Sequence, residues 1–157
     1  MTPTELTHEL KASREFFERS SRCLAEADSE FRPADGMYTT AQQVSHVART
    51  IEWFVEGASR PEGFDMDFAR HVAEANAVTS LTDARERLAK AYDHALQFFG
   101  SKTDAELSRP LPPGPVMGGA PIRAVVGAIA EHTAHHRGAL TVYSRLRGKT
   151  PLMPYGE

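Results

Sequence analysis

Cysteine, long apolar runs and secretion signals are scarce or missing in this sequence. Its 157 residues include a single cysteine, Cys23, so no internal disulfide can form. No apolar run approaches the roughly 20 residues of a membrane-spanning helix, and the first residues lack the basic-then-apolar pattern of a secretory signal. These absences predict a cytoplasmic protein with no membrane segment.

Concentrated positive charge is also missing. The chain carries 18 Lys+Arg against 21 Asp+Glu, a formal net charge of -3, whereas binding to nucleic-acid phosphates needs a concentrated cationic face. The one candidate face is a C-terminal cluster that falls in the last turns of a predicted helix, where cations complement the helix dipole. Its members are Arg137, Arg145, Arg147 and Lys149. We therefore expect no nucleic-acid partner.

The composition that remains is typical of one packed domain. At 41% hydrophobic and 25% charged residues, a chain of this length can bury a genuine core. Alternating strand patterns, internal repeats, phosphate-binding loops and nucleophile elbows are all missing. We expect residues 1–157 to form a single all-α domain.

Apolar residues recur at helical intervals in four segments. Long helices are predicted over residues 4–27, 40–58, 80–100 and 121–147, with a short helical turn over 68–75. Thr40 and Gln43 fit a capping box at the start of the second helix. Gly100 fits a C-cap and Pro121 fits a first turn.

These four helices predict a four-helix bundle. The short link between the first two favours antiparallel neighbours. The long link between the second and third, residues 59–79, allows those two to run in the same direction. We expect an up-down-down-up bundle with a long crossover between its second and third helices.

Two histidines lie one turn apart on the last predicted helix. On a wheel of 100° per residue, His132 and His136 fall in its apolar stripe, formed by Val125, Ile129, Leu140 and Tyr143. Side chains four residues apart project side by side, so their ring nitrogens can converge on a metal ion. The alternative is one hydrogen-bonded core histidine with a polar neighbour.

A third histidine, His46, lies on the second predicted helix beside Thr50 and Trp53. A lone histidine there is more often a hydrogen-bonded structural residue, but metal sites in bundles use inward residues of facing helices. With His132 and His136 it completes a three-histidine set. Such a set leaves one coordination position open, as in catalytic zinc sites, although imidazoles suit zinc, nickel, copper or iron nearly equally.

The other candidates are weaker. His135 lies about 60° to one side of His132 on the wheel, where it could line the site, relay protons or face solvent. We expect histidines 8, 71 and 94 to be solvated or locally hydrogen-bonded. Cys23 is expected to be a small buried residue of the first helix rather than a nucleophile.

Three segments together resemble the DinB family over nearly the whole chain. They are Val44-Ser45-His46-Val47-Ala48 with Trp53 downstream, Glu131-His132-Thr133-Ala134-His135-His136-Arg137-Gly138, and Pro154-Tyr155-Gly156. The resemblance, which extends to the YfiT-like metalloenzymes, implies an up-down-down-up four-helix bundle, often a homodimer. It also implies a divalent metal, zinc or nickel, held by His46, His132 and His136. Ala139 departs from the pattern, because many members carry Gln there.

The resemblance also suggests an activity. Members of the wider superfamily resemble S-transferases that use bacillithiol or mycothiol, in which the metal lowers the thiol pKa so that a thiolate attacks an electrophile. This implies a metal-dependent transferase or hydrolase acting on a small molecule, with a low-molecular-weight thiol as a candidate partner. The alternative is a non-catalytic, metal-stabilised bundle with a stress-response or interaction role.

Overall fold

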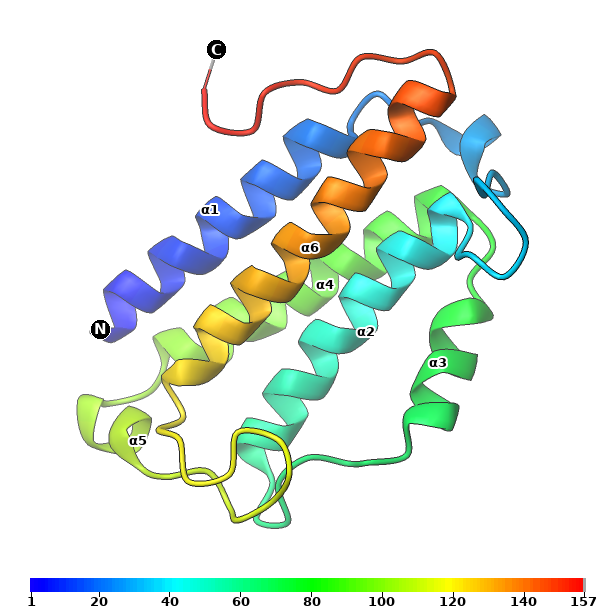
Figure 1. The fold of residues 1–157 in the computed structure, drawn as a ribbon. Helices are drawn as coiled ribbons and strands as arrows, with labels where there is room; N and C mark the ends of the chain where they lie inside the picture. Colours follow the sequence, from blue (N-terminus) through cyan, green and yellow to red (C-terminus); the bar gives the residue numbers. More distant parts are fainter. Residues whose placement is uncertain (157) are drawn as a thin grey trace.

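Four long helices lie side by side in the computed structural model, which describes residues 1–156 (Figure 1). They are α1 (Pro3–Ser21), α2 (Thr40–Ser59), α4 (Leu81–Gly100) and α6 (Ala124–Leu146). Both α1 and α2 pack against α4 and α6, so the four form a ring of contacts around one core. No strand occurs in the part of the chain that the structure describes, and the predicted all-α architecture is confirmed.

Shorter elements complete the fold. They are the 3-10 turn η1 (Glu26–Asp28), α3 (Phe68–Asn76) and α5 (Asp104–Ser108). The helix α3 packs on α2, where Figure 1 shows it beside the bundle. Among residues 1–156, no helix is both long and apolar enough to cross a membrane.

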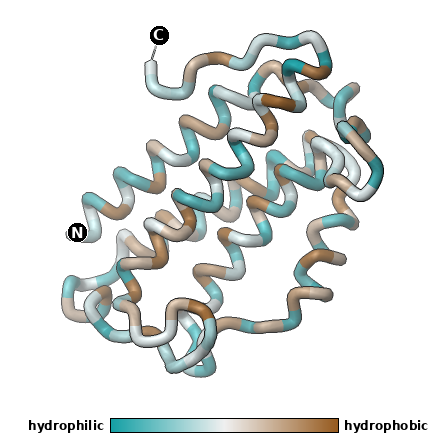
Figure 2. The backbone as a smooth tube through the Cα atoms, viewed as in Figure 1, coloured by the Kyte–Doolittle hydropathy of each residue, from teal (hydrophilic) through white to brown (hydrophobic). Residues whose placement is uncertain are grey.

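The core is built from the apolar stripes of the four long helices. Figure 2 shows hydrophobic and hydrophilic positions alternating along each of them, as helical periodicity requires. The largest fully buried side chains include Phe17 of α1, Ile51 of α2, Tyr92 and Phe99 of α4, and Ile129, Leu140 and Tyr143 of α6. All of these come from the predicted helices, and the stripe predicted on the last of them, Val125, Ile129, Leu140 and Tyr143, is confirmed.

The first helix ends earlier than predicted. It stops at Ser21 rather than near residue 27, because the Ala25 N–H, which a continuing helix would direct at the Ser21 carbonyl, donates to Asp28. Arg85 of α4 donates to the carbonyl oxygens of Ser21 and Leu24 at 2.8 and 3.0 Å. These bonds satisfy carbonyl groups that a continuing helix would have used. Cys23 therefore lies in a turn and is partly exposed, so its expected burial within a helix is wrong.

The starts of α2 and α6 also differ from the prediction. The N-cap of α2 is Thr39, whose side chain accepts from Gln42 while Gln42 accepts from the Thr39 N–H, so the capping box lies one residue earlier. The last helix begins at Ala124 instead of Pro121. The intervening backbone is bonded elsewhere: the N–H groups of residues 122 and 123 donate to carbonyls at and after α5. The sequence pattern did not reveal α5.

A buried carboxylate attaches the end of α6 to η1. Asp28 is 1% exposed and accepts from Arg147 at 3.0 Å, from Lys149 and from the Ala25 N–H at 2.8 Å. Burial acts to raise the pKa of Asp28, but the three donors outweigh it and lower that pKa to about 2. Two members of the C-terminal cationic cluster are thus engaged within the fold.

We expect Asp28→Asn to lower the free energy of unfolding by about 2 kcal/mol at pH 7, because two cations lose their charged acceptor. The Asp28 pKa falls from 3.8 to about 2 on folding, so this stabilisation is present above pH 4 and fades as the pH falls towards 2. Urea unfolding at pH 7 and pH 3 should show the cost shrinking by roughly 1 kcal/mol. The exposed Asp35→Asn is the control, and an equal cost at both pH values would contradict the assignment.

Candidate metal centre

Three imidazoles from two helices meet inside the bundle. His46 comes from α2, and His132 and His136 come from α6. One ring nitrogen of each lies within 4.8 Å of the other two, and the Nε2 atoms of His46 and His132 are 3.3 Å apart. The structure therefore brings together the three histidines that the sequence singled out. Their role as metal ligands stays a prediction.

Local packing sets the positions of these rings. The four-residue spacing on α6 places His132 and His136 on the same face, with ring centroids 4.5 Å apart. The packing of α2 on α6 then brings His46 to 5.1 and 4.8 Å from them. Tyr38, just before α2, stacks on His46 at 5.2 Å. The rings are thus held by aromatic contacts as well as by the helices.

Gln43, one turn before His46 on α2, orients His136. Its Oε1 lies 2.6 Å from His136 Nδ1, which must donate because an amide oxygen can only accept. Gln43 Nε2 donates to the Tyr143 hydroxyl at 3.2 Å, and that hydroxyl donates to the Tyr38 carbonyl at 2.8 Å. This chain of bonds fixes the tautomer of His136 and leaves its Nε2 with a free lone pair.

Sequence reasoning missed Gln43, although its position three residues before His46 places both on one face of a helix. That spacing was the available signal. The resemblance had pointed instead to residue 139, where this chain carries Ala in place of a family Gln. An amide contacts the histidine cluster here nonetheless, and it comes from α2.

The geometry of the donor atoms supports the metal interpretation. His132 Nε2 faces His46 Nε2 at 3.3 Å, and His136 keeps the lone pair of its Nε2 free because its Nδ1 donates to Gln43. The Nδ1 of His132 is buried with no hydrogen-bond partner among the described residues. Three neutral imidazoles are a donor set that divalent transition metals accept. The residues present therefore fit such an ion.

Burial keeps the three rings neutral. It lowers the pKa of His132 to about 4, with the nearby charges of His46 and His135 acting in the same direction. Burial, followed by the charges of His132, His46 and His135, lowers the pKa of His136 to about 3. The pKa of His46 is lowered mainly by burial as well. The lone pairs that a metal needs are therefore available even in mildly acidic solution.

The other histidines lie outside the cluster. His135 is exposed, with its ring 4.9 Å from that of His136, and His8 and His94 are exposed on α1 and α4. His71 of α3 is buried and hydrogen-bonded to Arg49 at 2.9 Å. His71 is thus hydrogen-bonded, but its partner Arg49 lies on another helix, so the bond is not the local one that was expected.

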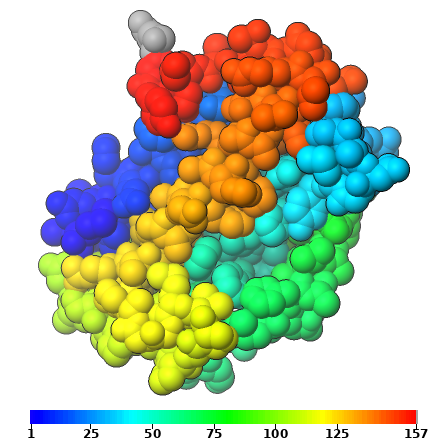
Figure 3. All heavy atoms as spheres, in the orientation of Figure 1, coloured from blue at the N-terminus to red at the C-terminus, as the bar shows by residue number. Residues whose placement is uncertain are grey.

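A cavity of about 240 Å³ opens beside His46 and His132. Figure 3 shows a recess there, between the orange surface of α6 and the green surface of α3, with α2 at its base. The remaining wall includes Arg49, Thr50, Trp53, Phe68, His71 and Val72. The wall residues that come from α2 follow His46 at helical spacing, so the sequence alone places them on the same helix face as His46. The contribution of α3 depends on tertiary packing.

The fold and the cluster define a helical-bundle protein with a candidate three-histidine metal centre. The chain belongs to the DinB superfamily, whose sequence model matches residues 9–140. It is also similar to the solved structure of YfiT from Bacillus subtilis, described as a probable metal-dependent hydrolase with an unusual four-helix bundle topology. The TM-score is 0.69 at 14% identity, covering 94% of this chain and 89% of that one, a likeness that concerns the fold alone. No curated protein matches the chain.

We expect the metal-free protein to lose stability as the pH falls from about 6.5 to about 4. In this window histidines of the unfolded chain bind protons, whereas the buried rings, with lowered pKa values, do not. Each ring that stays neutral in the folded protein lowers the free energy of unfolding by about 1.4 kcal/mol per pH unit across this window. Urea unfolding with a chelator present, from pH 7.5 to 4.5, measures this slope. The double variant His132→Gln, His136→Gln should show a shallower slope, and equal slopes would mean that the rings titrate normally.

Proposed function

We propose that this chain is a metal-dependent enzyme that holds one divalent ion, zinc or nickel, on His46, His132 and His136. Its substrate is a small molecule in the adjacent cavity of about 240 Å³. The observation that supports this most directly is the convergence of one ring nitrogen from each of the three histidines within 4.8 Å, with His46 and His132 lining that cavity. Three protein ligands leave a coordination position for water or substrate.

The type of reaction follows from the chemistry of a metal ion held by three imidazoles. When bound, a divalent metal supplies Lewis acidity and lowers the pKa of a water or thiol ligand. Gln43 holds the His136 ring in position through its 2.6 Å hydrogen bond, and the cavity wall presents apolar surface to the substrate. The description of YfiT favours hydrolysis, whereas the superfamily resemblance favours transfer to a low-molecular-weight thiol. The same residues serve either reaction.

The proposal extends to the organisation of the chain. We take the four long helices in the order up-down-down-up, with residues 60–80, which include α3, as the crossover between α2 and α4. Residues 1–157 form one domain, and the protein acts as a homodimer in the cytoplasm without a nucleic-acid partner. The single cysteine and the net charge of -3 support the last two points.

A second candidate is a non-catalytic bundle in which the metal serves stability or a stress-response interaction. The position of the cluster favours it, because the histidines join α2 to α6. A bound ion would cross-link two helices that are far apart in the sequence. The two candidates differ in whether turnover of any small molecule depends on the metal.

Metal content tests the site directly. We expect untagged protein purified without chelators to hold close to one equivalent of zinc or nickel, and the variant His46→Ala, His132→Ala, His136→Ala to hold none. Elemental analysis measures both, with circular dichroism confirming that the variant is helical. The double variant His8→Ala, His94→Ala, which removes exposed histidines, should keep its metal. Negligible metal in the parent protein after reconstitution with both ions would contradict the proposal.

Gln43→Leu should weaken metal binding by about 10- to 100-fold, because His136 loses the acceptor that fixes its tautomer. Gln43→Glu, which keeps an acceptor oxygen, should retain most of the affinity. Competition with a chromophoric chelator gives the dissociation constants. Gln97→Leu, at an exposed position of α4, is the matched control. An affinity unchanged in Gln43→Leu would show that the hydrogen bond plays no part in binding.

A further inference from the structure

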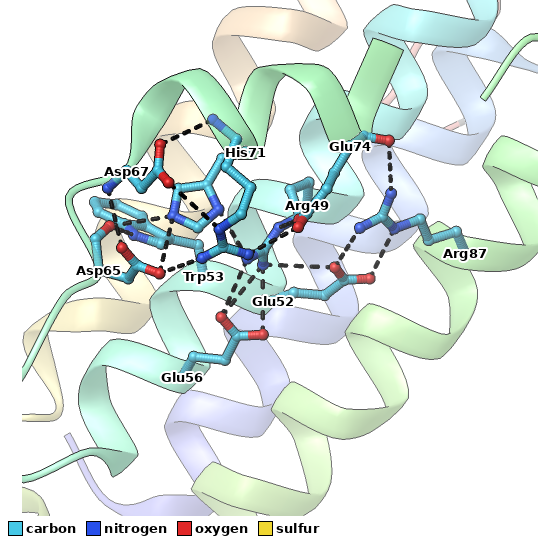
Figure 4. Close-up of polar contacts among 10 residues, drawn as sticks. Arg49, Glu52, Trp53, Glu56, Asp65, Asp67, His71, Glu74 and Arg87 are labelled. Atoms are coloured by element: carbon cyan, nitrogen blue, oxygen red, sulfur yellow. Dashed lines mark hydrogen bonds and ion pairs between the residues drawn. The ribbon is translucent and has the colours of Figure 1, made fainter. Parts of the chain in front are cut away.

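Three side chains that line the cavity, Arg49, Trp53 and His71, are already hydrogen-bonded within the protein (Figure 4). Arg49 is 5% exposed, and its Nε donates to Glu74 at 2.8 Å. Its Nη atoms donate to Glu56 at 3.3 and 3.4 Å, and Nη2 also donates to His71 Nδ1 at 2.9 Å. Every nitrogen of this guanidinium group has a partner. Arg49 therefore forms part of the cavity wall but has no free N–H donor for an anionic ligand.

Two ring N–H groups of the wall are also committed. Because a guanidinium can only donate, His71 accepts at Nδ1 and carries its proton on Nε2. That Nε2 and the Nε1 of Trp53 both donate to the Asp65 carbonyl, at 3.2 and 2.7 Å. Both rings are held through their N–H groups by the chain that precedes α3. What they contribute to the cavity is aromatic surface.

The charges behind this wall have a negative surplus. The ion pairs join three arginines to five carboxylates: Arg49, Arg70 and Arg87 with Glu52, Glu56, Asp65, Asp67 and Glu74. Glu52 is shared, lying 3.6 Å from Arg49 and 2.7 Å from Arg87. The charge of Arg49, which lines the cavity, is already balanced by Glu52, Glu56 and Glu74, so an anionic ligand group placed here would lose hydration without gaining a free cation. The wall thus disfavours a carboxylate-bearing ligand.

The cavity is large enough for a ring system, and its rim is apolar. A dry cavity of about 150 Å³ binds benzene, and this one measures about 240 Å³. Two apolar residues of α3 that line it, Phe68 and Val72, are 50% and 39% exposed. Trp53 packs beside Phe68, with its ring centroid 5.8 Å from that of Phe68. A ligand body seated here would cover apolar surface that the fold leaves in water.

We propose that this cavity binds the uncharged aromatic body of a small-molecule substrate, against Trp53, Phe68 and Val72. The reactive group of that substrate points to His46 and His132. The inference rests on the proposed function and makes it more specific. The cavity takes the uncharged ester, amide or electrophile that is attacked, and an anionic thiol has no complementary charge in this wall.

The single tryptophan of the chain makes the test direct. Trp53 gives the one indole N–H signal in a proton–nitrogen NMR spectrum, and it lines the cavity. Full-length protein is titrated with benzyl alcohol and with benzoate, which share a ring and differ in charge. We expect benzyl alcohol to shift the Trp53 signal saturably and to bind at least tenfold more tightly than benzoate. Equal or tighter binding of benzoate to metal-free protein, or no shift with benzyl alcohol, would overturn the proposal.

Two variants that introduce the same carboxylate, one at the cavity rim and one away from it, provide a matched comparison. Val72→Asp should weaken benzyl alcohol binding at least tenfold, because it puts a carboxylate at the apolar rim. Val142→Asp makes the same change at a position of α6 that is 54% exposed and does not line the cavity, and it should leave binding unchanged. Equal effects of the two variants would overturn the assignment.

Titrations of metal-free and zinc-loaded protein separate this inference from the proposed function. Binding of benzyl alcohol to the metal-free chain tests the cavity alone. Metal content tests the histidine cluster alone, so either can fail while the other stands.

Discussion

The packing of α2 against α6 is the contact on which the rest of this structure depends. It brings His46 to His132 and His136, and it is reinforced by the 2.6 Å hydrogen bond from His136 to Gln43. Without it, α6 would carry an isolated pair of histidines and α2 a single one. Because the rings come from separate helices, any shift between the helices would change the cluster directly. The hydrogen bond across this contact limits such a shift.

Side chains on the other faces of α2 form ion pairs and hydrogen bonds with α4 and with the region of α3, close to the histidine cluster. Arg49 and Trp53 face α3, and Glu52 reaches Arg87 on α4. Charged groups are thus paired with one another next to a cavity, while the imidazoles at its far end are neutral at pH 7 because burial lowers their pKa values. A neutral donor cluster beside an apolar wall is suited to a cation on one side and an uncharged ligand on the other.

Much of the site was predictable because it follows helix periodicity. The four-residue spacing of His132 and His136 places both rings on one face of any helix that contains them, and His46, Thr50 and Trp53 obey the same rule. Helix ends were less predictable, because long-range bonds decide them. Arg85 donates to the Ser21 carbonyl at the end of α1, and the N–H groups of residues 122 and 123, just before α6, donate to carbonyls at and after α5. Those partners lie far away in the sequence.

The sequence by itself determined the all-α class, the apolar stripes, the DinB resemblance and the three histidines, since each depends on residue type at local spacing. Only the tertiary structure decided that Gln43 orients His136, that His71 binds Arg49 and that α3 forms a wall of the cavity. The physical reason is the range of the interactions. A helix's periodicity is set within a few residues, whereas a hydrogen bond or a cavity needs side chains that only packing brings within a few ångströms.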